Sequence, residues 1–240
     1  SEIGKQGLGG VYRDIELPLI SLIETAQNYG ILVDTKHLEK LSSEYHKKLN
    51  EITARIYAHA GGEFNMNSPK QLGEILFDKL GLATKGLKKT EGGARSTRES
   101  ELAKLRTIHP IIEDILLYRE LQKLLSTYID NFPQLIGKDG RLHTTLNQAG
   151  TTTGRMSSSN PNLQNIPVRG EMGAAIRSAF VAPKGSILLA CDYSQIEMRV
   201  LAALSGDQHL IDVFKTGIDV HTSVASRVFN VDQKDVTAEM

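Results

Sequence analysis

The spacing of apolar residues is the feature that most constrains this chain: it follows a helical period up to Ile129 and loses it at Pro133. The clearest helical run starts at Asp34-Thr35, which can cap a helix, and stops at Gly61-Gly62. Apolar side chains recur along one face of this run at Leu38, Leu41, Tyr45, Leu49, Ile52 and Ile56. These patterns predict an N-terminal half built of amphipathic helices, followed by a part with a different architecture.

Further helices are expected in the N-terminal half. Residues 14–28 carry apolar positions at helical spacing and are followed by a glycine that can end a helix. Ser68-Pro69-Lys70-Gln71 has the composition of a capping box that opens a helix to about Leu80, and Ser96-Thr97-Arg98-Glu99 is a second such box. A strongly amphipathic helix is predicted after His109-Pro110.

Beyond Pro133 the pattern predicts strands and loops. Residues 137–140 have the composition of a hairpin turn and lead into a strand over 141–148. The polar segment 151–167 shows little regular period, and loops of this length in compact domains are usually functional. The apolar run 186–191 predicts a short buried strand that ends at Asp192, with a helix after it.

Composition excludes several classes of protein. The single cysteine, Cys191, excludes an intramolecular disulfide. No apolar run approaches the roughly 20 residues of a bilayer span, so no membrane partner is expected. Residues 1–10 contain four glycines and are expected to form a linker.

The formal net charge is zero, which argues mildly against nucleic-acid binding because such proteins usually carry a basic excess. The charges are nevertheless unevenly distributed. Residues 84–106 carry seven Lys or Arg against three Glu, whereas residues 207–240 carry six acidic residues against three basic ones. The net charge therefore decides nothing, and the basic segment is either a contact for a polyanion or a solvated helix end.

Asp192 is the first candidate catalytic residue. At the end of a buried strand, beside a backbone carbonyl, a carboxylate can hold a hard cation such as Mg²⁺. On spacing alone a structural role is more common, in which Asp192 or Ser194 caps the following helix.

The string Asp192-Tyr193-Ser194-Gln195-Ile196-Glu197-Met198-Arg199 closely resembles the first catalytic motif of family A DNA polymerases. It departs from the usual form, DYSQIELR, only at Met198. The resemblance implies that Asp192 ligates both catalytic Mg²⁺ ions and that the Tyr193 carbonyl helps to hold one. It also implies that Gln195 binds the nucleotide, and that Glu197 lies where a ribose 2′-OH would go and so selects deoxynucleotides.

A second segment, residues 152–169, is similar to the family's TGRLSS…NLQNIPVR motif. Its amide and guanidinium groups can hydrogen-bond the minor-groove acceptors that all correct base pairs share. The resemblance implies that Arg169 lies near the incoming triphosphate and that four residues bind the primer–template duplex near its terminus: Arg155, Asn162, Gln164 and Asn165. Without the resemblance, the segment could be a polar surface loop with Asn-Pro and Ile-Pro turns.

A third string, Gly217-Ile218-Asp219-Val220-His221-Thr222, resembles the G-x-D-I-H segment at the start of the fingers. It implies that His221 contacts the phosphates of the incoming nucleotide, although a lone His is more often structural. The N-terminal half resembles a polymerase thumb, with the basic loop as its tip. The residues that this resemblance implies to bind DNA are Lys88, Lys89, Arg95, Arg119 and Lys123.

The resemblance covers roughly residues 11–240 and implies an α+β fold. The expected parts are a helical thumb over 11–130, a palm with an antiparallel sheet over 131–205 and the start of the fingers over 206–240. The implied reaction is template-directed DNA synthesis, in which a dNTP is joined to a primer 3′-OH by a two-metal mechanism. The implied partners are primer–template DNA and dNTP, and the protein is expected to be a cytoplasmic monomer.

The family's second carboxylate motif and its triphosphate-binding fingers helix are not found in these 240 residues. Two metal ions require more than one protein carboxylate. The chain alone is therefore predicted to bind DNA without copying it. The alternatives are a non-catalytic DNA-binding module or one half of a split polymerase.

Overall fold

The computed structural model describes residues 2–82, 86–90, 92–93, 95–168, 170–237 and 240. The chain folds into two compact units, Ser1–Leu188 and Leu189–Met240.

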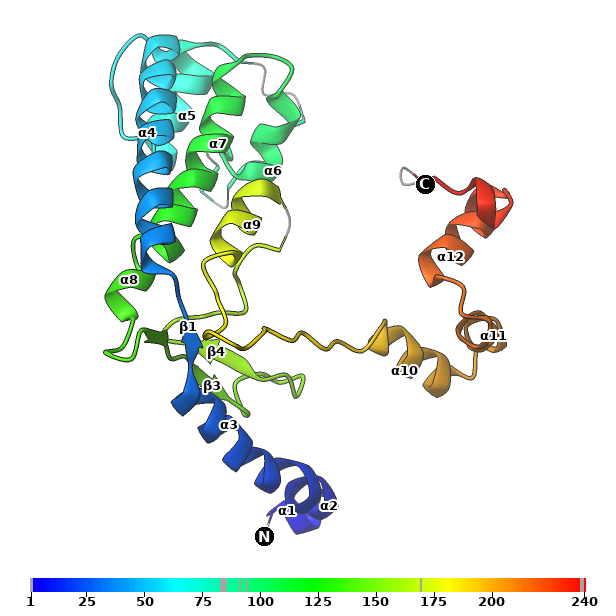
Figure 1. Ribbon diagram of the computed structural model, residues 1–240. Helices are drawn as coiled ribbons and strands as arrows, with labels where there is room; N and C mark the ends of the chain where they lie inside the picture. The colour runs from blue at the N-terminus through cyan, green and yellow to red at the C-terminus, as the bar shows by residue number, and fades with distance from the viewer. Residues whose placement is uncertain (1, 83–85, 91, 94, 169, 238–239) are drawn as a thin grey trace. The chain divides into compact units, whose positions relative to one another are not determined.

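Two long helices, α4 (Thr35–Ala60) and α7 (Ile111–Leu124), pack side by side in the first unit (Figure 1). The carboxylate of Asp34 caps α4 by accepting a hydrogen bond from the backbone N–H of His37, at 3.0 Å. Gly61 ends α4 in the left-handed conformation, with φ +67°. All six apolar positions expected on one face of this helix are buried, so the prediction for α4 is confirmed.

Shorter helical segments complete this unit. They are α1 (Glu2–Lys5), α2 (Gly9–Val11), the π-helical turn η1 (Tyr12–Glu16), α3 (Leu17–Tyr29), α5 (Pro69–Gly73), the π-helical turn η2 (Glu74–Lys79), α6 (Glu99–Leu102), the 3-10 turn η3 (Ala103–Leu105), the π-helical turn η4 (Leu125–Ile129), α8 (Phe132–Leu135) and α9 (Gly170–Arg177). The helix predicted over 14–28 is present as η1 and α3. The expected linker over 1–10 contains helical turns at α1 and α2 instead.

The two predicted capping boxes behave differently. Ser68 caps α5 by accepting from the Gln71 N–H, but the Gln71 side chain accepts from the Asn65 N–H rather than bonding back to Ser68. The second box is wrong, because α6 begins at Glu99 and the side chain of its N-cap residue makes no capping bond. Ser96 instead donates its backbone N–H to the Lys88 carbonyl, so a tertiary contact overrides the local helix signal.

In the part of the chain that the structure describes, the strands form two small antiparallel sheets, as expected for an α+β fold. In the first, β1 (Ile31–Leu32) pairs with β2 (Arg141–Leu142), and in the second β3 (Thr145–Asn147) pairs with β4 (Ser157–Ser159). The strand predicted over 141–148 is thus divided in two, and β4 lies within the segment predicted to be irregular. The division falls at His143 and Thr144, whose side chains bond to other parts of the chain.

His143 joins the end of α3 to this strand region. Its ring nitrogens hydrogen-bond the Gln27 carbonyl at 2.7 Å and the Asp139 carboxylate at 3.1 Å. The bond to the carbonyl, and then the bond to the carboxylate, raise the pKa of His143. A Cβ at Gly30, where φ is +60°, would lie 2.7 Å from this ring, so the junction requires glycine.

One apolar core runs through the first unit from α4 and α7 to α8, β2 and α9. Leu125 is buried in this core. No helix among the described residues combines the length and the apolar character that crossing a bilayer requires.

The second unit consists of α10 (Ile196–Ser205), α11 (Gln208–Thr216), α12 (Val220–Phe229) and the 3-10 turn η5 (Gln233–Asp235). The strand expected over 186–191 is wrong: this segment is irregular, and Ile187 and Leu189 are 84% and 79% exposed. A strand needs a neighbour for its backbone N–H and C=O groups. Among the described residues, none pairs with this segment in a sheet.

Candidate nucleic-acid interface and catalytic motif

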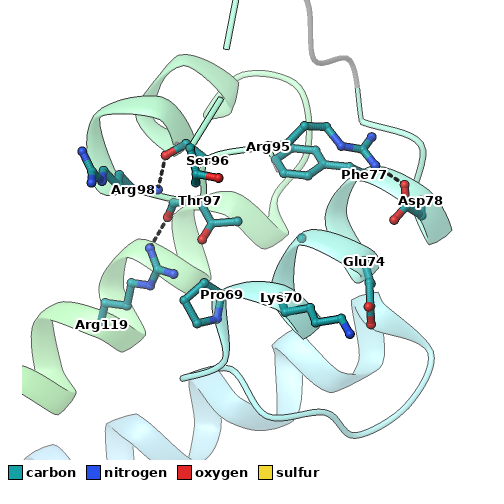
Figure 2. Close-up of a pocket in the computed structure, with 12 residues that line it drawn as sticks. Pro69, Lys70, Glu74, Phe77, Asp78, Arg95, Ser96, Thr97, Arg98 and Arg119 are labelled. Atoms are coloured by element: carbon teal, nitrogen blue, oxygen red, sulfur yellow. Dashed lines mark hydrogen bonds and ion pairs between the residues drawn. The ribbon is translucent and has the colours of Figure 1, made fainter. Parts of the chain in front are cut away.

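The first hollow of functional interest lies between α5, η2, the segment around Ser96 and α7, and has a volume of about 630 Å³ (Figure 2). Its charged lining residues are mainly basic: Lys70, Arg95, Arg98 and Arg119, against Glu74 and Asp78. Arg95 is ion-paired with Asp78, and its guanidinium lies 5.0 Å from the centre of the Phe77 ring. These contacts fix one cationic group at the edge of the hollow.

Arg119 reaches the same hollow from α7. Its guanidinium donates to the Thr97 carbonyl at 2.5 Å, as Figure 2 shows. Burial lowers the pKa of Arg119, and the nearby Glu99 carboxylate acts in the opposite direction. An arginine stays charged at neutral pH despite such a shift. Of its five N–H donors, one is used in a hydrogen bond to the described residues, so the group can also bind an anion.

Two further hollows continue from Arg119 along the same unit. One, of about 390 Å³, is lined by Arg119, Lys123, Tyr128 and Asn165 among others. The next, of about 780 Å³, shares Lys123, Tyr128 and Asn165 with it and adds Asn162. Because neighbouring hollows share lining residues, they adjoin one another. We call the five predicted DNA-binding residues along them the Arg–Asn surface: Arg95, Arg119, Lys123, Asn162 and Asn165.

The other predicted DNA-binding residues lie elsewhere or outside the described residues. Lys88 and Lys89 are exposed and do not line these three hollows, although their backbones pair with the segment at Arg95 and Ser96. Arg155 also lies outside the hollows, and the Gln164 side chain donates to the Met156 carbonyl at 3.0 Å. Arg169 falls outside the described residues.

Sequence reasoning missed Ser96 and Thr97 as part of this surface. Both are buried and line the first hollow, and Thr97 supplies the carbonyl that holds Arg119. Their spacing before Glu99 matched a capping box, which hid the role of this segment. The contact between Thr97 and Arg119 spans 22 residues and left no local signal.

In the second unit, Asp192 and Tyr193 are exposed in the irregular segment that precedes α10. Neither Asp192 nor Ser194 caps that helix, so the structural alternative for Asp192 is wrong. The N-cap residue is Gln195, with φ +52° and no side-chain bond to the helix. The Asp192 carboxylate is therefore not used in helix capping.

The remaining motif residues are held by contacts within this unit. The Gln195 side chain donates to the Asp219 carboxylate at 2.9 Å, which ties the start of α10 to the start of α12. Arg199 donates to the Ser194 carbonyl at 2.9 Å and stacks over Phe214. Glu197 is exposed in the first turn of α10. His221, in the first turn of α12, lines an apolar hollow of about 670 Å³ that Met198 also lines.

The described residues do not by themselves form a complete magnesium site. Mg²⁺ prefers six oxygen ligands, and the Asp192 carboxylate and Tyr193 carbonyl can supply only part of such a set. No cluster of three or more His, Cys, Asp or Glu suited to a metal ion occurs in the part of the chain that the structure describes. The Asp192 carboxylate can thus offer one hard oxygen ligand, but the described residues around it do not make a metal centre.

Comparison with known proteins agrees with these motifs. The model of the family described as DNA polymerase family A matches residues 35–240. DNA polymerase I, thermostable, from Thermus aquaticus is 50% identical over 234 residues, which cover 97% of this chain and 28% of the relative. DNA polymerase I from Lactococcus lactis is 51% identical over 226 residues, 94% of this chain and 25% of the relative. The chain therefore spans about a quarter of the length of these curated relatives.

A solved structure is similar over nearly the whole chain. It is the POL domain of Pol1 from M. smegmatis, in complex with DNA primer-template and dNTP. The TM-score is 0.91 at 40% sequence identity, and the match covers 99% of this chain and 42% of that one. The family model spans well over half of the chain, so this chain belongs to DNA polymerase family A.

Proposed function

We propose that this chain is the part of a template-directed DNA polymerase that binds the duplex and carries the first catalytic motif. Such a polymerase joins a dNTP to a primer 3′-OH. The Arg–Asn surface is the observation that carries the proposal. It gathers basic and amide side chains from segments around residues 95, 119–123 and 162–165 along adjoining hollows of one unit. A polymerase must hold a duplex of any sequence, and this combination of groups can do so.

The two ends of the Arg–Asn surface suit different parts of a duplex. Arg95, Arg119 and Lys123 offer charged donors, which bind phosphates without regard to sequence. Asn162 and Asn165 offer amides, which can donate to the minor-groove acceptors common to all correct base pairs. The M. smegmatis Pol1 domain, which was solved with primer-template and dNTP, supports this assignment. Arg155, Gln164, Lys88 and Lys89 are proposed to extend the contact.

In the proposed reaction, Asp192 supplies one of the carboxylates that hold two Mg²⁺ ions, with help from the Tyr193 carbonyl. Such ions stabilise the charge that develops on the attacking and leaving oxygens. Gln195, Arg169 and His221 are proposed to bind the incoming dNTP, and Glu197 to exclude a ribose 2′-OH. The thumb, palm and fingers boundaries at about residues 130 and 205 are part of the same proposal.

Duplex binding by the 240-residue chain tests the role of the Arg–Asn surface. Arg119→Gln and Lys123→Gln are each expected to weaken binding of a primer–template duplex roughly tenfold, as expected when a charged hydrogen bond is lost. Each should also reduce the slope of log affinity against log salt concentration by about one, because one fewer phosphate is neutralised. Fluorescence anisotropy over a salt series measures both quantities.

Arg55→Gln is the matched control, because Arg55 is a basic residue on α4 that is ion-paired with Asp114 and lies outside the three hollows. It should leave both affinity and salt slope unchanged. Equal losses for Arg55→Gln and Arg119→Gln would show that binding follows general charge, and the assignment of the surface would then be wrong.

Nucleotide selection tests the role of Glu197 in a complete enzyme. A suitable enzyme is a chimera in which the matching part of this chain replaces the 226 aligned residues of the Lactococcus lactis DNA polymerase I. Glu197→Ala should raise ribonucleotide incorporation relative to deoxynucleotide incorporation by roughly 10- to 100-fold, because the side chain no longer fills the space that a ribose 2′-OH would occupy. Single-nucleotide incorporation kinetics measure this ratio, and unchanged selectivity would remove the gate assignment.

A DNA-binding role without chemistry is the second candidate, because the described residues contain no metal-binding cluster. Primer extension separates the possibilities. We expect no extension by the 240-residue chain alone. Extension by the chimera would support the polymerase role, whereas duplex binding with an inactive chimera would favour the binding module. Activity that appears only when the chain is mixed with the rest of a relative would indicate a split enzyme.

A further inference from the structure

Gln195 has an unusual backbone conformation at the centre of the catalytic motif. Its φ of +52° lies in the left-handed region, which is rare for a residue with a side chain and persists when surrounding contacts hold it. The contact that holds its side chain comes from another helix: Gln195 Nε2 lies 2.9 Å from Asp219 Oδ1. The conformation that presents Asp192 and Glu197 on either side of Gln195 is thus tied to α12.

Asp219 uses its two carboxylate oxygens for two different tasks. Oδ1 accepts from Gln195, whereas Oδ2 accepts from the backbone N–H of Thr222 at 2.8 Å and from the Thr222 hydroxyl at 3.1 Å. The N–H of Thr222, and then the side chains of Gln195 and Thr222, lower the pKa of Asp219 against the opposing effect of burial. The carboxylate is therefore ionised at neutral pH and accepts hydrogen bonds on both sides.

Asp207 is a useful comparison, because it shows that an aspartate can cap a helix without a second bond to a distant side chain such as Gln195. It caps α11 in the same way, accepting from the Leu210 N–H at 3.1 Å. Within the described residues, the hydrogen bonds of Asp207 are all local, to Ser205, Leu210 and Ile211. The contact between Asp219 and Gln195 joins residues 24 positions apart and is additional to the cap.

We propose that Asp219 is a positioning residue of the polymerase site: it holds Gln195, and through it the first catalytic motif, in fixed register with His221. His221 follows Asp219 by two residues on α12, and Glu197 follows Gln195 by two on α10. One carboxylate thus sets the distance between the residue proposed to contact the triphosphate and the residue proposed to test the sugar. The inference rests on the proposed function for its catalytic consequence, but not for the side-chain link itself.

The substitution Asp219→Ser separates the two tasks. Serine is as good a helix N-cap as aspartate, but its hydroxyl is too short to reach Gln195 while capping. Asp219→Asn is the rescue variant, because its oxygen can keep the cap while its amide nitrogen donates to a flipped Gln195 amide. Asp207→Ser is the matched control at the cap of α11.

The first measurement uses the 240-residue chain and nuclear magnetic resonance of the Gln195 side-chain amide. Asp219→Ser should shift these amide resonances and speed their exchange with water about 10-fold, as expected for loss of a charged hydrogen bond. Resonances of the α12 backbone should keep their protection, since the cap remains. Asp207→Ser should leave Gln195 unchanged. A Gln195 amide that does not respond to Asp219→Ser would overturn the link.

The second measurement uses the chimera. Asp219→Ser should raise the KM for dNTP about 10-fold and lower the preference for deoxynucleotides, with unchanged affinity for duplex. Gln195→Ala should have a similar effect, the double variant should be no worse than either single one, and Asp219→Asn should restore most of the loss. Additive losses, or a loss confined to stability, would overturn the positioning role. A chimera without activity would contradict the proposed function, and the amide measurement would still decide the link.

Discussion

Asp192→Asn is expected to lower the rate of nucleotide incorporation by the chimeric polymerase about a thousandfold or more, while the affinity for primer–template duplex stays nearly the same. The substitution keeps the shape of the side chain but removes its negative charge. A hard divalent cation requires that charge on its oxygen ligand. Loss of one strong electrostatic contact to a transition state costs about 10²- to 10³-fold, and misplacing two ions should cost more. Single-turnover kinetics and duplex anisotropy measure the two quantities separately.

The exposed position of Asp192 makes this prediction informative. No described helix uses its carboxylate as a cap, so a stability effect should be small. Asp212→Asn is the control, because Asp212 is another acidic residue of the second unit and, among the described residues, its side chain bonds only to the nearby Gln208 side chain. It should leave the incorporation rate within about twofold, as surface substitutions usually do. An active Asp192→Asn chimera would exclude Asp192 as a metal ligand.

Ile112→Ala should destabilise the first unit by about 2–5 kcal/mol, the usual cost of truncating a fully buried isoleucine. Ile112 lies in the first turn of α7, is 0% exposed and belongs to the core shared with α4. The cavity left behind removes packing between α4 and α7, and α7 carries Arg119 and Lys123 of the Arg–Asn surface. The unfolding temperature of that unit should fall by roughly 5–20 °C.

Differential scanning calorimetry of the 240-residue chain measures this change. Ile108→Ala removes the same atoms from a side chain that is 49% exposed, and it should change the unfolding free energy by no more than about 0.5 kcal/mol. A similar loss for both variants would mean that α7 does not form the centre of the core.

Local sequence patterns predicted the helices well, because their causes are local. The period of the apolar residues marked the buried face of α4, and Asp34 and Gly61 marked its ends. These signals depend on residues within one or two turns of each other. The string around Asp192 likewise identified the family, which the family model confirms.

Local patterns failed where distant contacts compete with them. The serine of the second capping box bonds through its backbone N–H to the Lys88 carbonyl and does not cap α6, and Gln195 takes a left-handed conformation beside Asp219. The run 186–191 has the composition of a buried strand, but a strand forms only beside another strand, and none of the described residues supplies one.

The sequence by itself thus determined the helical half, the antiparallel α+β character and the family of this protein. Only the tertiary structure decided that Arg95, Arg119, Lys123, Asn162 and Asn165 line adjoining hollows, and that Asp219 holds Gln195. The physical reason is the distance along the sequence between the residues that interact. A helix is stabilised by neighbours along the chain, whereas a binding surface is made by side chains that folding brings together from far apart.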